Sequence, residues 1–203
     1  MDATEQFARI VNGGIVYLGE AALAMAAHVY PDLDAAAEMR RLEALAARVR
    51  DESRAELCRV LFAEVGLRGN RENYYDPDNS FINRVLDTGV GIPISLAVVM
   101  LEVGHRAGVR LTGISAPSHF LVRDELDGAL LDPFDRGAEV THADGPAASP
   151  VDIVARMLNN LRSIYTSTND LTNLLWVLRL RTVLPGATPD VHHELQRAQA
   201  RLN

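Results

Sequence analysis

The sequence predicts an α+β fold that is mostly helical, with a small antiparallel sheet packed on one central helix. Three observations support this prediction. Apolar residues recur at helical spacing through most of residues 4–66 and again after residue 150. Between residues 109 and 132, three short segments with strand character follow one another, which is typical of antiparallel strands. Residues 93–106 are apolar on most of the helix circumference, so this helix belongs in the core.

Composition and charge are those of an ordinary globular domain. The 203 residues are 48% hydrophobic and 23% charged, which suits one domain or one domain with a small appendage. A net charge of −7, from 27 acidic and 20 basic residues, disfavours binding to nucleic acid or to an anionic membrane. The sequence contains no zinc spacing, phosphate loop or dinucleotide fingerprint, so we expect neither a metal nor a cofactor.

We expect a cytoplasmic protein. Cys58 is the single cysteine, which excludes an internal disulfide and favours a reducing compartment. Residues 15–29 are apolar, but they contain Glu20 and His28 and have no basic leader. They therefore predict a core helix rather than a signal peptide or a membrane span.

The first 66 residues predict four helices. These cover residues 4–11, residues 15–28, a segment capped by Asp32 or Asp34, and a segment containing Cys58 that ends at Gly66. Cys58 has no Gly-rich or helix-dipole setting, so it is predicted to be a small buried residue rather than a nucleophile.

A loop and a short helix are expected next. Residues 69–78 predict a loop, and Tyr75 within it is compatible with a packed aromatic corner. Asn79 or Ser80 is expected to cap a helix over residues 81–86. The amide of Asn79 has two alternative roles, which are contacting a substrate and holding a loop.

The central helix carries a serine close to its start. Pro93 suits the first helical position because its φ angle is already helical, and Gly108 is the natural terminator. Ser95 therefore lies near the helix N-terminus, where unpaired N–H groups and the helix dipole favour negative charge. A reactive thiolate or a developing oxyanion is stabilised well at such a position.

The predicted strands are residues 109–114, 119–123 and 129–132. His119 opens the second strand and Asp132 closes the third. A two-residue turn at residues 127–128 would pair Arg123 with Asp132 and leave His119 about 13 Å along the ladder, at roughly 3.3 Å per residue. A four-residue turn over residues 124–127 would pair His119 directly with Asp132. Turn preference favours the first register, whereas a His–Asp site needs the second.

The rest of the chain predicts a loop and then helices. Residues 135–150 are expected to form the loop, and a long helix follows Pro150. From residue 168 the pattern predicts a helical hairpin that turns at Pro185 and Gly186. Trp176 is expected to pack this hairpin onto the core. His142, His192 and His193 have no other potential ligands at the spacings that are typical of metal sites.

Four motifs along the chain carry a resemblance to a known family. They are Asn79-Ser-Phe-Ile-Asn-Arg-Val-Leu, Gly91-Ile-Pro-Ile-Ser-Leu, His119-Phe-Leu-Val-Arg and Asp132-Pro-Phe. Together they resemble the SirB-type branch of the transglutaminase-like superfamily, over roughly residues 20–165. The resemblance implies a papain-like core, with a cysteine at a helix N-terminus and His and Asp on neighbouring strands. By position these become Ser95, His119 and Asp132, so a serine replaces the cysteine.

The resemblance also implies a domain organisation. A transglutaminase-like domain would cover residues 1–165, with a helical part at 1–66 and the core with its site at 67–165. Residues 166–203 would form a helical hairpin tail like a degenerate tetratricopeptide unit. The loop with Tyr75 would be one wall of a groove, and Asn79, Tyr75 and Ser118 would contact a substrate.

Two hypotheses for function are open. In the first, Ser95 is the nucleophile, His119 its general base and Asp132 the group that orients His119, for acyl transfer or for hydrolysis of an amide or ester. In the second, the chain is a catalytically inactive pseudo-enzyme that binds a protein or peptide partner. Ser95 then caps its helix, His119 is a hydrogen-bonded core residue and Asp132 forms an Asx turn. The sequence identifies neither the partner nor the oligomeric state.

Overall fold

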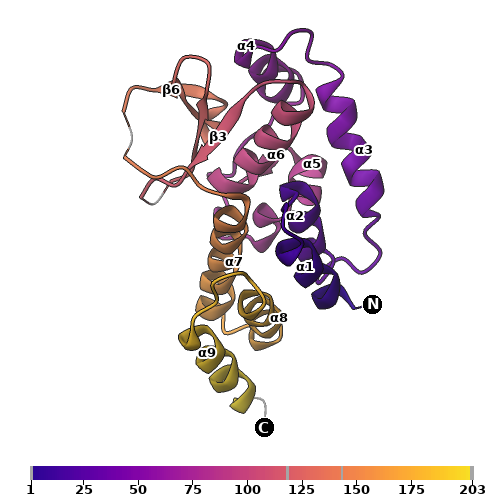
Figure 1. Cartoon of the computed structure of the whole chain (residues 1–203), viewed down its shortest axis with the longest axis vertical. Helices are drawn as coiled ribbons and strands as arrows, with labels where there is room; N and C mark the ends of the chain where they lie inside the picture. Colours follow the sequence, from indigo (N-terminus) through magenta and orange to yellow (C-terminus); the bar gives the residue numbers. More distant parts are fainter. Residues whose placement is uncertain (1, 118, 143, 202–203) are drawn as a thin grey trace. The chain divides into compact units, whose positions relative to one another are not determined.

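The computed structural model describes residues 2–117, 119–142 and 144–201, and the chain forms two compact units (Figure 1). The terminal unit combines Met1–Leu33 with Pro150–Asn203, and the central unit is Asp34–Ser149. The domain boundary expected at residue 165 stays a prediction. Among the described residues, no helix is long and apolar enough to cross a membrane.

The terminal unit is built from helices at both ends of the chain. They are α1 (Ala3–Asn12), α2 (Leu18–Ala26), α7 (Pro150–Ser167), α8 (Leu171–Thr182) and α9 (Pro189–Ala200). Asp2 caps helix α1: its carboxylate accepts the Glu5 N–H at 2.9 Å, and the Glu5 carboxylate accepts the Asp2 N–H. Helix α1 packs on α2 and α8, and α2 also packs on α7. Segments far apart in the sequence therefore share one core.

Trp176 holds α8 against the N-terminal helices. Its ring stacks on His28 with the centroids 5.1 Å apart and meets Tyr165 edge-on at 6.2 Å. The His28 ring nitrogens lie 3.1 Å from the carbonyl of Ala24 and 3.2 Å from the hydroxyl of Thr4. His28 lies just past the end of α2 and Tyr165 belongs to α7, so the Trp176 ring packs on residues of the terminal unit.

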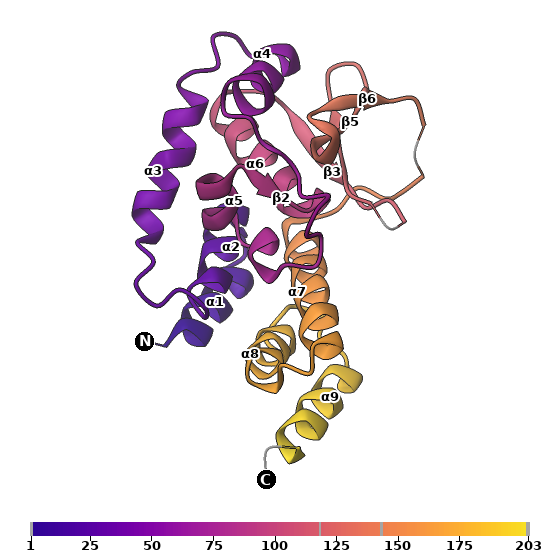
Figure 2. The same cartoon turned by 180° about the vertical axis from the view of Figure 1, so that it is seen from behind.

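Helix α6 (Pro93–Arg106) is the centre of the other unit. The remaining helical elements there are α3 (Ala35–Ala46), α4 (Arg54–Cys58), the π-helical turn η1 (Arg59–Glu64), η2 (Pro77–Ser80), α5 (Ile82–Thr88) and η3 (Pro133–Asp135). Both views show α6 lying between α3 on one side and the sheet on the other (Figures 1 and 2). Pro93 occupies the first helical position, and Gly108 adopts a left-handed φ of 80° just past the end.

The sheet confirms the predicted fold class. Its antiparallel strands are β3 (Leu111–Ile114), β4 (Leu121–Asp124), β5 (Leu130–Asp132) and β6 (Ala138–Val140), paired in that order. Helix α6 packs on β3 and β4, so the fold is α+β around one central helix. Strand β6 lies where a loop was predicted, and His119 precedes β4 by two residues instead of opening it. A short parallel pair, β1 (Arg68–Gly69) with β2 (Val90–Gly91), was also missed.

The register of β4 and β5 differs from both predicted alternatives. Arg123 pairs with Leu130, which is midway between the partners that the two turns would give it. The connecting loop spans residues 125–128 and is closed by the Asp124 N–H, which donates to the carbonyl of Ala129 at 2.9 Å. A shift of two residues keeps side chains on the same face, so His119 and Asp132 meet along a diagonal of the hairpin.

The start of α5 corrects another expectation. Its first turn is preceded by Phe81, and no side chain forms the cap, so neither Asn79 nor Ser80 has the predicted capping role. Ser80 is fully buried, and its hydroxyl has no hydrogen-bond partner among the described residues. The preceding turn η2 is capped instead by Asp76, whose carboxylate accepts the Asp78 N–H at 3.0 Å.

Candidate functional site

His119 and Asp132 come together as the resemblance implied. The Nε2 atom of His119 lies 2.8 Å from Oδ2 of Asp132, and the two side chains are 33% and 16% exposed. Because Nε2 faces the carboxylate, the imidazole plane is oriented and Nδ1 is the ring nitrogen that faces elsewhere. A His–Asp pair held in this way can accept and return a proton.

Asp132 also shapes the turn that follows β5. Its Oδ1 accepts the N–H of Phe134 at 2.9 Å, and its carbonyl accepts the N–H of Gly137 at 2.7 Å. One carboxylate oxygen therefore starts the η3 turn while the other faces His119. The Asx-turn role and the histidine-orienting role of Asp132 are compatible with each other.

Ser95 lies in the interior of the unit. Its side chain is fully buried, and its hydroxyl donates to the carbonyl of Asn79 at 2.5 Å. The same oxygen accepts the N–H of Ile92 at 3.1 Å, which satisfies a donor at the first turn of α6. A Cβ atom at Gly91 would lie 2.8 Å from the Ser95 oxygen, so the backbone of β2 closes tightly over it. The described partners of the hydroxyl are all backbone groups, since it also lies 3.1 Å from the carbonyl of Ile92.

Asn79 holds the preceding loop in shape. Its side-chain nitrogen donates to the carbonyls of Asn73 at 2.7 Å and Tyr74 at 3.1 Å, and its oxygen accepts from the Asn70 amide at 2.9 Å. Asn79 is 3% exposed, so both ends of its amide serve the loop. Ser118, the third residue expected to contact a substrate, lies outside the described residues.

A row of aromatic rings extends from His119 to the surface. We call Tyr75, Tyr74, Phe134 and His119 the aromatic row. Successive rings meet edge-to-face, with centroid distances of 5.3, 5.9 and 6.4 Å. The Arg71 guanidinium lies 5.1 Å from the centre of the Phe134 ring. Tyr75 ends the row and is 74% exposed. The loop that contains Tyr75 therefore presents rings near the His–Asp pair.

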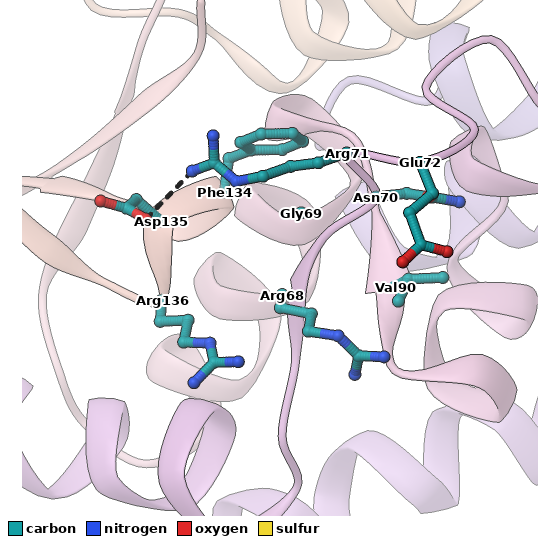
Figure 3. A pocket seen from close by; sticks show the side chains of 9 residues that line it. All are labelled: Arg68, Gly69, Asn70, Arg71, Glu72, Val90, Phe134, Asp135 and Arg136. Carbon is teal, nitrogen blue, oxygen red and sulfur yellow. Dashed lines mark hydrogen bonds and ion pairs between the residues drawn. The ribbon is translucent and has the colours of Figure 1, made fainter.

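A cavity of about 270 Å³ lies beside Phe134 (Figure 3). The Phe134 ring closes one wall by packing directly on Gly69, where an added Cβ would lie 2.5 Å from the ring. Arg71 spans the rim and pairs with Asp135 at 3.1 Å. Arg68 and Arg136 also line this cavity, and their guanidinium groups extend in the same direction in Figure 3.

Cys58 is not poised for chemistry. Burial raises the pKa of its thiol to about 11, so the thiol is protonated near neutral pH. Gly137 packs against it so closely that an added Cβ would lie 2.9 Å from the sulfur. In the parts of the chain that the structure describes, no group of three or more His, Cys, Asp and Glu side chains is arranged to hold a metal ion.

Comparison with known families decides the relationship. The model of the transglutaminase-like superfamily matches residues 27–149, more than half of the chain. The chain belongs to this superfamily. The matched region nearly coincides with the central unit, so the family fold is carried by Asp34–Ser149 and includes Ser95, His119 and Asp132.

Several curated relatives share parts of this chain. A UPF0162 protein of Xylella fastidiosa is 35% identical over 181 aligned residues, which cover 73% of this chain and 64% of the relative. A UPF0162 protein of Vibrio cholerae is 42% identical over 79 residues, or 37% of this chain and 29% of the relative. F-box only protein 21 of Mus musculus is 41% identical over 78 residues, or 37% of this chain and 12% of the relative.

The chain spans 64% of the length of the two Xylella fastidiosa relatives. No solved structure matches it significantly. These comparisons agree with the family resemblance of the four sequence motifs. They extend the relationship to bacterial UPF0162 proteins and to part of a mammalian F-box protein.

Sequence reasoning missed most residues around the cavity. Phe134 was part of a quoted motif, but no role was assigned to it. The sequence offered no reason to single out Arg68, Arg71 or Arg136, because an arginine in a loop is usually exposed to solvent. Gly69 could have indicated this packing, because a glycine outside a tight turn often marks a place where another group approaches the backbone closely.

Proposed function

We propose that this transglutaminase-like domain binds an extended protein segment without covalent catalysis. The observation that carries the proposal is the position of Ser95. Its hydroxyl is 0% exposed and already donates its proton to the carbonyl of Asn79. A nucleophilic serine needs its oxygen accessible to the substrate and its proton directed to a base. The proposal therefore assigns Ser95 to the stability of α6.

The aromatic row supports the binding part of the proposal. It offers a strip of rings from the exposed Tyr75 to the His119–Asp132 pair. Aromatic side chains present large contact areas at low entropic cost, and they are enriched in interfaces. At the inner end, the partly exposed imidazole and carboxylate can hydrogen-bond a backbone that passes over them. An extended segment with apolar side chains fits this combination.

The second candidate function is acyl transfer, and the 2.8 Å contact between His119 and Asp132 favours it. In that reaction the Ser95 oxygen attacks a carbonyl carbon, and His119 takes the hydroxyl proton. His119 then returns the proton to the departing amine or alcohol, and water or an amine releases the acyl group. For this the start of α6 must open, because the Ser95 hydroxyl is engaged with the backbone.

A fluorophosphonate probe distinguishes the two candidates. The probe is incubated with the parent chain, with Ser95→Ala and with an unrelated serine hydrolase as a control for probe reactivity. We expect the hydrolase to be labelled and both forms of this chain to stay unlabelled. Labelling of the parent that is lost in Ser95→Ala would overturn the proposal and establish Ser95 as the nucleophile.

A displayed library of random peptides tests binding directly. Peptides enriched on the parent chain are measured against Tyr75→Ala and against Leu126→Ala. Leu126 is 76% exposed on the β4–β5 loop and outside the aromatic row, which makes it a matched control. We expect Tyr75→Ala to weaken binding about tenfold and Leu126→Ala to leave it unchanged. Equal binding by all three forms would exclude the aromatic row as the surface.

A further inference from the structure

We propose that the cavity beside Phe134 is a binding site for a small oxyanion, a carboxylate or a phosphate group, held by Arg68 and Arg136. The inference goes beyond the proposed peptide binding and does not depend on it. It rests on the cavity, on the charges that line it and on the backbone that positions Arg136.

The residues that line the cavity carry more positive than negative charges. Asp135 is engaged by Arg71 at 3.1 Å, which leaves Glu72 as the other carboxylate on the lining. Neither Arg68 nor Arg136 forms an ion pair with any residue in the described ranges. The Arg68 side chain reaches only the carbonyl of Gly66, at a long 3.4 Å. Two arginines without an ion pair in the described ranges therefore line one hollow in a chain whose net charge is −7.

The backbone holds Arg136 in an unusual conformation. Its φ angle of 55° is in the left-handed region, and within the described residues only Asn169 is another non-glycine with positive φ. Asparagine tolerates this region well, whereas arginine has no such preference. The conformation is imposed by the turn after Asp132, which the Gly137 N–H closes at 2.7 Å. A strained position occupied by a charged side chain beside a cavity points to a role in binding.

The chemistry of guanidinium groups identifies the ligand class. Arginine binds carboxylates and phosphates through paired N–H donors, and more strongly than neutral donors do. A volume of about 270 Å³ accommodates a molecule of the size of succinate or inorganic phosphate. Val90 and Phe134 add apolar surface for a short carbon chain, and Glu72 disfavours a highly charged polyanion.

Titration calorimetry of the full chain tests the site, with inorganic phosphate in one arm and succinate in the other, at constant ionic strength. The variants are Arg68→Gln and Arg136→Asn, since asparagine keeps the left-handed backbone. Arg40→Gln is the matched control, because Arg40 is 65% exposed, does not line the cavity and loses the same charge. We expect binding of at least one anion, weakened about tenfold by each cavity variant and unchanged by the control.

The outcomes distinguish a phosphate ligand from a carboxylate ligand, and they test the anion site separately from peptide binding. Binding of phosphate alone or of succinate alone identifies the preferred anion, and both results support the site. Absence of binding in both arms overturns the proposal, and so does an equal loss in Arg40→Gln. Because the peptide selection is read out independently, a failure here leaves the proposed function in place, and the reverse also holds.

Discussion

His119 and Asp132 are in contact although they are not paired residues of the hairpin. The nitrogen–oxygen distance is 2.8 Å, while β4 and β5 pair in a register that sets Arg123 against Leu130. The contact is made along the diagonal, by a histidine that lies before the strand begins. The turn after Asp132 fixes the carboxylate, so the geometry of this pair depends on that turn as much as on the sheet.

Replacement of Asp132 should therefore be costly for stability. We expect Asp132→Ala to lower the free energy of unfolding by about 1–2 kcal/mol, because the Phe134 N–H loses its acceptor. Asp132→Asn keeps an acceptor oxygen for that N–H and should lose clearly less. Urea titrations of the three forms provide the measurement. If the alanine variant unfolds at the same urea concentration as the parent, the structural role of the turn is refuted.

Ser95→Ala should also destabilise the chain. The substitution leaves the Ile92 N–H without its side-chain acceptor inside the core, and we expect a loss of about 1–3 kcal/mol. Thr141→Ala, at an exposed position, is the control and should change little. Chemical denaturation of both variants measures the difference. A stability equal to that of the parent would contradict the structural role and favour the catalytic one.

Gly69 and Phe134 should be energetically coupled. An alanine at Gly69 would bring its Cβ to 2.5 Å from the Phe134 ring, so we expect Gly69→Ala to lose about 1–3 kcal/mol. Replacement of Phe134 by leucine in the Gly69→Ala background removes the clash. The double variant should therefore lose less free energy of unfolding than the sum of the two single variants. A double-mutant cycle measures this coupling. Simple additivity would show that the close packing is absent in solution.

The terminal unit should lose stability in mild acid. Burial lowers the pKa of His28 below its usual 6.5, so the unfolded chain binds the proton more readily than the folded chain does. The stabilisation is fully present above pH 6.5 and declines as the pH falls below that value. Thermal unfolding between pH 8 and pH 5 measures the decline.

Two variants isolate the contribution of His28. His28→Gln should flatten the pH dependence of the unfolding temperature. His142→Gln should leave it as in the parent, because His142 is 81% exposed. A parental slope retained in His28→Gln would assign the acid sensitivity to other groups.

Cys58 should react slowly with alkylating reagents. With a pKa of about 11, only a minute fraction of its thiol is ionised near neutral pH. We expect iodoacetamide to modify the folded chain far more slowly than it modifies glutathione at pH 7.5, and the rate should still be rising at pH 10. Mass spectrometry follows the reaction. A plateau in rate near neutral pH would contradict the raised pKa.

The elements that could be predicted from the sequence are those in which several sequence features agree. The central helix was foreseeable because Pro93, Gly108 and a continuous apolar run between them all agree. Strand β6 was not, since Ala138–Val140 is short and mostly exposed, and its partner strand decides its conformation. The hairpin register also escaped prediction. Side-chain bonds from Asp124 within the loop, such as the 2.9 Å bond from the Leu126 N–H, outweighed the preference for a tight turn at Gly128.

The candidate site was predictable in its residues and less so in its geometry. The family resemblance implied that His119 and Asp132 lie on neighbouring strands, whereas the turn preference alone favoured a register that keeps them apart. The motifs gave no indication that the Ser95 hydroxyl would turn toward the carbonyl of Asn79, because that carbonyl belongs to a turn with no regular pattern. The cavity depends on long-range contacts of loops, which are the least patterned parts of any sequence.

The first helices of the terminal unit are synthesised well before the helices that cover them. Helices α1 and α2 leave the ribosome before α7 and α8, which cover them and lie more than a hundred residues later in the chain. At usual translation rates the delay is on the order of ten seconds. During that interval the nascent segment carries leucine, methionine and phenylalanine side chains that α7 and α8 do not yet cover.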